Sequence, residues 1–150
     1  MRIFTYKTTQ HLKTDIDTAW NFFSDPRNLI KITPEWLGFK ITCSLPAKMF
    51  PGMLITYKVN PLLKIPLTWV TQINSIEEKC CFIDEQKFGP YKLWHHKHTF
   101  KVTPTGIEMT DEVTYALYFG IFSPLVNKLI VSKKIDEIFS FRKNVLGQLF

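Results

Sequence analysis

The sequence lacks the short motifs that mark several large classes of enzyme. It contains no GxxxxGKS/T loop for nucleotide phosphates, no GxGxxG turn for a dinucleotide and no HExxH helix for catalytic zinc. It also lacks any run that approaches the roughly 20 apolar residues of a membrane-spanning helix. These absences argue against a P-loop nucleotidase, a dinucleotide-dependent oxidoreductase, a zinc peptidase and stable insertion into a membrane.

Cysteine is scarce, and the basic residues are not gathered into a stripe. The three cysteines comprise Cys43 and the adjacent pair Cys80-Cys81, an odd number that forms no tidy set of disulfides. Together with the absence of an apolar signal segment after Met1, this predicts a reduced, cytoplasmic protein. The net charge of +6 is dispersed along the chain, which favours a solvated surface and predicts no nucleic-acid partner.

Two stretches between Phe88 and Gly120 alternate with a period of two residues, as strands with one buried face do. One side of the first carries Trp94, His96, His98, Phe100 and Val102, and one side of the second carries Met109, Asp111, Val113, Tyr115 and Leu117. The segment 103–106, TPTG, predicts a turn between them. The two stretches therefore predict a hairpin with one buried face.

Charges on the outer face indicate the register of this hairpin. The register that pairs opposite charges joins Lys101 to Glu108 and Lys97 to Glu112. Such pairs directly across a ladder stabilise by about 0.2–1 kcal/mol each, and a slip of one residue would exchange the buried and exposed faces. On the inner, otherwise apolar face, the same register places His98 opposite Asp111.

The rest of the chain supplies five more strands and three helices. Predicted strands cover residues 2–11, 36–44, 54–60, 67–75 and 80–88, and predicted short helices cover residues 16–24 and 27–31. Thr14 and Asp17 form a capping-box pattern before the first short helix, and Asp25-Pro26 is typical of a helix start. Ser123-Pro124 predicts the start of a helix that continues to about residue 150. One domain over residues 1–150 accounts for all of these elements.

Several local segments resemble one protein family. They are residues 20–29 (WNFFSDPRNL), 33–39 (TPEWLGF), 84–91 (DEQKFGPY), 94–100 (WHHKHTF), 110–115 (TDEVTY) and 119–120 (FG). These segments and the order of elements resemble the bacterial ligand-binding branch of the START/SRPBCC superfamily. The resemblance implies an α+β helix-grip fold, in which a curved seven-stranded antiparallel sheet wraps around a long C-terminal helix. It also implies a small hydrophobic or amphipathic ligand between sheet and helix; polyketide cyclases and carriers of lipids are among the members.

The alternation and the resemblance together select the candidate ligand-binding residues. They are Trp69, Asp84, Gln86, Trp94, His96, His98, Phe100, Met109, Asp111, Val113 and Tyr115. Strand 80–88 carries Asp84 and Gln86 on the inner face only if a bulge at Gly89-Pro90 sets that parity. A cluster of this kind buries polar groups at a cost of several kcal/mol unless they are hydrogen-bonded.

Four interpretations of the polar residues remain open. His98 and Asp111 could form a buried pair that holds the register, or they could orient the polar head of a ligand. They could also be catalytic, with His98 as general base oriented by Asp111, or His96, His98 and Asp84 could share a metal ion. We favour a non-catalytic carrier or sensor, without metal or cofactor, over a polyketide cyclase/dehydratase-like enzyme.

A protein-interaction module is the alternative of another class. The apolar loop 62–65 (LLKI), between Pro61 and Pro66, could cover the core, form the rim of a ligand site or dock a partner together with Leu149-Phe150. A concentration-dependent mass would favour this module, whereas a co-purified lipophile would favour a carrier.

Overall fold

A seven-stranded antiparallel sheet, of order β1-β7-β6-β5-β4-β3-β2, forms the frame of the protein. The computed structural model describes residues 1–61 and 65–150. The strands are β1 (Phe4–Leu12), β2 (Lys40–Ile41), β3 (Leu54–Val59), β4 (Leu67–Glu77), β5 (Cys81–Phe88), β6 (Leu93–Thr103) and β7 (Gly106–Ala116). This confirms the predicted α+β helix-grip architecture.

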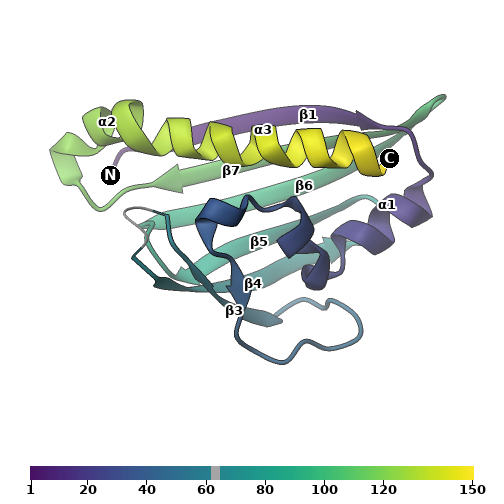
Figure 1. Cartoon of the computed structure of the whole chain (residues 1–150), viewed down its shortest axis with the longest axis horizontal. Coiled ribbons are helices and arrows are strands. Elements are labelled where there is room, and N and C mark those ends of the chain that lie inside the picture. The colour runs from purple at the N-terminus through teal and green to yellow at the C-terminus, as the bar shows by residue number, and fades with distance from the viewer. Residues whose placement is uncertain (62–64) are drawn as a thin grey trace.

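One long helical run crosses a face of this sheet. It consists of α2 (Ser123–Val126), the π-helical segment η4 (Asn127–Val131) and α3 (Ser132–Leu149), and it follows the short turn η3 (Gly120–Phe122). Figure 1 shows α3 lying along β1 and β7, while the short helices η1 (Pro26–Ile32) and η2 (Glu35–Leu37) lie over β4 and β5 on the same side. The space between sheet and helices is therefore roofed by two separate parts of the chain.

The first helix, α1 (Ile16–Phe23), begins where the sequence predicts, but its cap differs. Asp15, not Thr14, is the N-cap, and its carboxylate accepts hydrogen bonds from the Thr18 backbone N–H at 2.8 Å and the Thr18 hydroxyl at 2.7 Å. Asp is as good an N-cap as Thr or better, and Asp15 has the extended backbone that this position requires. Asp17 is instead free to pair with Lys79.

The second short helix is confirmed as a 3₁₀ segment, whereas the strand predicted at 36–44 is mostly wrong. Asp25 caps η1 by accepting from the Arg27 backbone N–H at 3.0 Å. The next residues form η2, which ends at Gly38 with a left-handed φ of 58°. Only Lys40 and Ile41 pair with a neighbouring strand, because the turn at Gly38 occupies the first part of the predicted strand.

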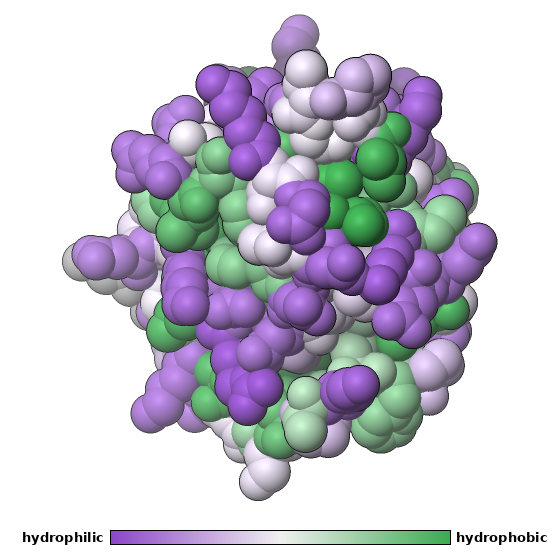
Figure 2. Space-filling view, turned by 90° about the vertical axis from the view of Figure 1, so that its right-hand side faces the viewer, coloured by the Kyte–Doolittle hydropathy of each residue, from purple (hydrophilic) through white to green (hydrophobic). Residues whose placement is uncertain are grey.

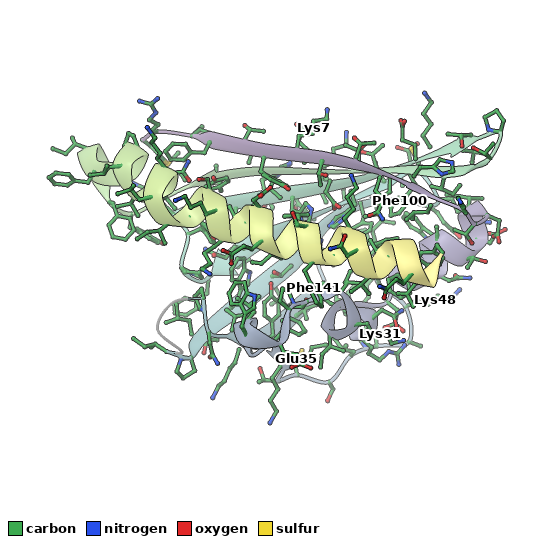
Figure 3. The ribbon with its side chains drawn as sticks, turned by 45° about the horizontal axis from the view of Figure 1, so that its top comes forward. Lys7, Lys31, Glu35, Lys48, Phe100 and Phe141 are labelled. Carbon is green, nitrogen blue, oxygen red and sulfur yellow. The ribbon has the colours of Figure 1, made fainter. Side chains whose placement is uncertain are left out.

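The hairpin of β6 and β7 has the predicted register. Lys101 lies opposite Glu108, Lys97 opposite Glu112 and His98 opposite Asp111. The ion pair of Glu112, however, is with Lys7 of β1, at 3.1 Å. Figure 3 shows Lys7 on the side of β1 that points away from α3. The outer charges thus link β7 to its neighbour on the other side.

The predicted docking surface comprised the loop 62–65 and the C-terminal residues 149–150. The loop residues Leu62-Leu63-Lys64 lie outside the described residues. Of the predicted docking pair at the C-terminus, Phe150 is partly buried with its ring 5.4 Å from that of Phe22, whereas Leu149 is exposed. Figure 2 shows the end of the molecule near α1 and the C-terminus, where hydrophobic patches alternate with hydrophilic side chains. Among the described residues, no helix combines the length and the apolar character needed to cross a membrane.

Candidate functional site

Four polar side chains meet on the inner face of the sheet, and we call them the tetrad: Asp84, His96, His98 and Asp111. Asp84 of β5 faces His96 of β6, and His98 faces Asp111 of β7. All four belong to alternating positions of their strands, so their side chains share one face. The uncertain parity of Asp84 is thereby resolved toward the inside.

The hydrogen bonds of the tetrad cross the ladder diagonally. His96 Nε2 donates to Asp111 Oδ1 at 2.9 Å, and His98 Nε2 donates to Asp84 Oδ2 at 3.0 Å. The directly opposite pair also touches, since His98 Nδ1 lies 2.9 Å from Asp111 Oδ1, but off the hydrogen-bond direction. His96 Nδ1 lies 3.5 Å from Asp84 Oδ2. Each carboxylate therefore bridges both imidazoles.

Burial and these contacts shift the pKa values of the two histidines in opposite directions. Burial opposes the charged form of His98, but its contacts with Asp111 and Asp84 outweigh this and raise its pKa above the ordinary value. Burial, followed by the positive charge of His98, lowers the pKa of His96. His98 is thus the more basic ring of the pair, and His96 is the ring that more readily stays neutral. The ring of His98 stacks on Phe82 at 4.0 Å, an arrangement that favours a cation.

Both carboxylates stay ionised in spite of their burial. Burial raises the pKa of Asp84, but the hydrogen bond from His98 and the positive charges around it bring the pKa below its ordinary value. For Asp111, burial acts in the same direction, and the hydrogen bond from His96 together with the close contact of His98 reverses it, so its pKa is far below the usual range. With His98 protonated, the two carboxylates and one imidazolium leave the tetrad with a single net negative charge.

A cavity of about 180 Å³ opens beside the tetrad, between sheet, α3 and the short helices. This volume is an order of magnitude more than the ~10–15 Å³ that one water molecule requires. The walls are mostly apolar. Lining side chains include Leu29, Ile32, Leu37, Phe39, Tyr57, Val59, Trp69, Thr71, Tyr91, Trp94, Ile135, Ile138, Phe139 and Arg142, together with Asp84, His96 and His98.

Aromatic rings form one wall of the cavity. Trp69 lies at 5.8 Å from Tyr57 in a stacked arrangement, at 5.5 Å from Tyr91 and at 5.3 Å from Trp94 edge-on. The Thr71 hydroxyl joins this wall, because it accepts from Trp69 Nε1 at 3.0 Å and shares a hydrogen bond of 2.9 Å with the Tyr57 hydroxyl. The polar side-chain atoms of Tyr57, Trp69 and Thr71 are therefore paired with one another.

Five of the predicted ligand-binding residues line the cavity. They are Trp69, Asp84, Trp94, His96 and His98. All five come from β4, β5 and β6, the strands that lie beneath the gap between α3 and the short helices. The remaining predicted residues lie elsewhere.

Asp111 stands behind the histidines rather than in the cavity wall, so it can act on a ligand only through them. Gln86 is committed to its own turn, since it donates to the Tyr91 carbonyl at 2.6 Å and accepts from the Tyr91 backbone N–H at 3.2 Å. Tyr115 donates its hydroxyl to Asn127 at 2.8 Å. These three predicted site residues are placed by the structure in supporting positions.

Phe100, Met109 and Val113 are core residues. Phe100 packs against Trp20 at 5.6 Å, and Figure 3 shows it at the end of the sheet where α1 lies. Met109 and Val113 are completely covered. Alternation places them on the correct face but cannot tell a cavity wall from a packed core, which depends on what lies above each position.

Sequence reasoning missed Arg142, a buried side chain of α3 that lines the cavity. It missed Tyr57 and Thr71 as well. Those two had a usable signal, since the alternation in residues 54–60 and 67–75 puts them on inner faces. No pattern in the sequence indicated Arg142, because the side of α3 on which it lies depends on the π-helical segment η4 that precedes α3.

Asp84, His96 and His98 could also hold a metal ion, since one ligand atom from each lies within 4.8 Å of the others. Two imidazoles and a carboxylate are a donor set that Zn²⁺ accepts, and Asp111 would orient both imidazoles from behind, as carboxylates do around such sites. Of these atoms, His98 Nε2 and Asp84 Oδ2 are already joined through a proton at 3.0 Å, and His96 Nδ1 lies 3.5 Å from the same oxygen. Hydrogen bonds therefore already connect both histidines of the tetrad to carboxylates.

Comparison with known proteins finds similarity in structure only. No family model matches the sequence, and no curated protein matches it. Protein CV1439 from Chromobacterium violaceum superposes with a TM-score of 0.74 at 12% identity, over 97% of this chain and 96% of its own. The Zhui aromatase/cyclase from Streptomyces sp. R1128 gives a TM-score of 0.74 at 11% identity, over 98% and 93% of the two chains.

Ara h 8.0201 is similar too, with a TM-score of 0.62 at 11% identity, over 97% of this chain and 98% of its own. At such identities the likeness is one of fold. The seven-stranded antiparallel sheet with a long C-terminal helix across one face is common to these proteins and to the present chain. The chain therefore has the helix-grip fold.

Proposed function

We propose that the protein binds a compact hydrophobic or amphipathic molecule in the cavity between the sheet and α3. The observation that carries this proposal is the cavity of about 180 Å³, with aromatic rings on one wall and the tetrad on another. Packed interiors contain few voids larger than a water molecule. An apolar cavity with a few convergent polar groups is the usual form of a small-molecule site.

The cavity volume restricts the ligand. Pockets for drug-sized molecules span about 300–1,000 Å³, so a cavity of about 180 Å³ suits a molecule of one or two rings or a short alkyl chain. The aromatic wall favours a ring, because stacked and edge-on contacts add to the area that a ring buries.

The tetrad supports a carrier or sensor better than an enzyme. Acid–base catalysis requires a group within reach of the substrate that is free to exchange a proton with it. In the tetrad every imidazole nitrogen lies within 3.5 Å of a carboxylate oxygen, so neither ring is free unless the tetrad opens. The polyketide cyclase-like alternative rests on His98, which lines the cavity with a raised pKa.

Native mass spectrometry of freshly purified protein tests the proposal directly, since a retained small molecule appears as an added mass. Ile138→Trp places a larger ring in the cavity wall and is expected to abolish the added mass. Leu125→Trp is the matched control, because Leu125 lies on the same helical run but is 57% exposed and outside the cavity. Equal retention of ligand by both variants would contradict this location.

The catalytic alternative needs a different measurement. If His98 is an acid–base catalyst, His98→Gln abolishes turnover of an aromatic ketone or polyketide substrate while the ligand affinity is kept. If the protein is a carrier, the same variant changes affinity or stability, and wild-type protein shows no turnover of the bound molecule.

An interaction module is the second candidate, and one surface feature favours it. Six large apolar side chains between β7 and α3 are more than half exposed: Tyr118, Phe119, Ile121, Phe122, Leu125 and Leu129. A concentration-dependent mass in light scattering that is lost in Phe122→Glu would support a self-associating module. A constant monomer mass would exclude self-association through this segment.

A further inference from the structure

Arg142 is an arginine on the inner stripe of α3, where the other buried residues are apolar. Its neighbours on this stripe are Ile135, Phe139 and Leu146, spaced by three or four residues as one helix face requires. Arg142 is only 8% exposed and lines the cavity. A guanidinium cannot lose its proton at physiological pH, so the helix carries a permanent positive charge to the cavity.

This charge has no partner in the part of the chain that the structure describes. Arg142 Nε is buried without a hydrogen-bond acceptor, and no ion pair of the guanidinium within 4.0 Å exists among residues 1–61 and 65–150. Its close contact is with the ring face of Phe139, at 4.8 Å. A buried charge without a hydrogen-bonding counter-ion is strongly unfavourable, so this position is stabilised when an anion joins it.

The acidic side chain that shares the cavity wall with Arg142 and the histidines is already hydrogen-bonded. Arg142, Asp84 and Tyr57 line the same cavity, and the charge of Arg142 favours the ionised forms of both other groups. Asp84 receives His98 at 3.0 Å and faces His96 at 3.5 Å. The carboxylate of Asp84 is therefore held by the tetrad, and the guanidinium remains available to a ligand.

We propose that the cavity binds a compact, ring-bearing carboxylate, with its anion on Arg142 and its ring against the aromatic wall. This inference rests on the proposed function and names the class of ligand for it. A guanidinium matches a carboxylate with two parallel hydrogen bonds. A monoanion is favoured over a phosphate dianion, because the negatively charged tetrad borders the same cavity and repels a second negative charge.

Matched acid and amide probes separate this inference from the proposed function. Cinnamate and its neutral isostere cinnamamide supply a ring, while octanoate and octanamide supply a chain, and each is titrated by calorimetry. For the wild type we expect cinnamate to bind at least about tenfold tighter than cinnamamide, the effect of one buried charge-assisted pair. Arg142→Met removes this preference and leaves cinnamamide affinity within about threefold of wild type.

Arg142→Lys serves as the second variant, since it keeps the charge and loses the two-pronged geometry; it is expected to retain part of the preference for the acid. If the amides bind the wild type as tightly as the acids, or if Arg142→Met keeps the acid preference, the inference about the anion is wrong and the cavity still binds ligands. If no probe of either pair binds, both this inference and the proposed function are contradicted.

Discussion

Asp111→Asn tests the role of the tetrad, because it removes one negative charge with almost no change of shape. Asp111 is 5% exposed and lies 2.9 Å from one nitrogen of each histidine. Hydrogen bonds to charged groups contribute about 1.5–3 kcal/mol each, and a neutral acceptor keeps part of this. We expect the free energy of unfolding to fall by about 3 kcal/mol at pH 5.5, with the loss of a buried charge partner as the main cause.

The pH dependence of this loss follows from the shifted groups. The depressed pKa of Asp111 makes its contribution present above the unfolded value of ~3.9 and lost as the pH falls through the folded value. The raised pKa of His98 makes its contribution full below the unfolded value of ~6.5 and lost as the pH rises through the folded value. The difference between wild type and variant is therefore largest between about pH 4 and 6.5.

Urea denaturation followed by circular dichroism at pH 5.5 and pH 9 measures the effect, and NMR titration of the ring protons identifies His98. For a chain of this size a loss of about 3 kcal/mol corresponds to a melting temperature about 6–12 °C lower. Glu112→Gln is the matched control, since it removes an exposed carboxylate on the next residue, whose pair with Lys7 is worth about 0–1 kcal/mol. A loss below about 1 kcal/mol at pH 5.5, or an unchanged pKa of His98, would refute the reasoning.

Three further predictions concern the cavity wall, the backbone and metal. Thr71→Val leaves the Tyr57 hydroxyl and Trp69 Nε1 without a partner. Calorimetry should therefore show a free energy of unfolding about 2–4 kcal/mol below that of the wild type, whereas that of Thr71→Ser should stay close to the wild-type value. Gly106→Ala, at φ 146° and against the β1 backbone, should lower the free energy of unfolding by about 2 kcal/mol or more. Gly147→Ala on α3 should raise it by up to about 1 kcal/mol, because the added methyl group meets only Gln10 Nε2, at an ordinary contact distance of 4.0 Å. EDTA should leave the melting temperature unchanged in a thermal-shift assay, because protons already join the tetrad; a fall of several degrees would show that a metal does so instead.

Alternation in the sequence was sufficient for the hairpin that carries the tetrad. Side chains of a strand point to opposite faces with a period of two, so the register that pairs outer charges also determines which residues lie inside. This is why His98 and Asp111 were correctly placed opposite each other. The sequence could not predict which histidine bonds to which aspartate, because an imidazole ring reaches a diagonal neighbour as easily as the residue directly opposite. The structure joins His96 to Asp111 and His98 to Asp84.

Alternation in the sequence also could not predict which inner residues face the cavity. Phe100 and His98 are two residues apart on one strand, yet Phe100 lies under α1 and His98 under the gap between α3 and the short helices. Their surroundings depend on two elements that lie far apart in the chain, α1 (Ile16–Phe23) and α3 (Ser132–Leu149). Local periodicity in the sequence does not show which helix covers a given strand position.

By itself, the sequence determined the order of the elements, the strand faces and the family resemblance, because each depends on local chemistry repeated at a fixed period. Only the tertiary structure decided that Arg142 faces the cavity. The π-helical segment 127–131 shifts the helix phase, so that the inner stripe becomes Ile135, Phe139, Arg142 and Leu146, whereas Leu125 and Leu129 lie outside. A helix phase accumulates along the whole run, and a single wide turn is enough to bring a charged residue inside.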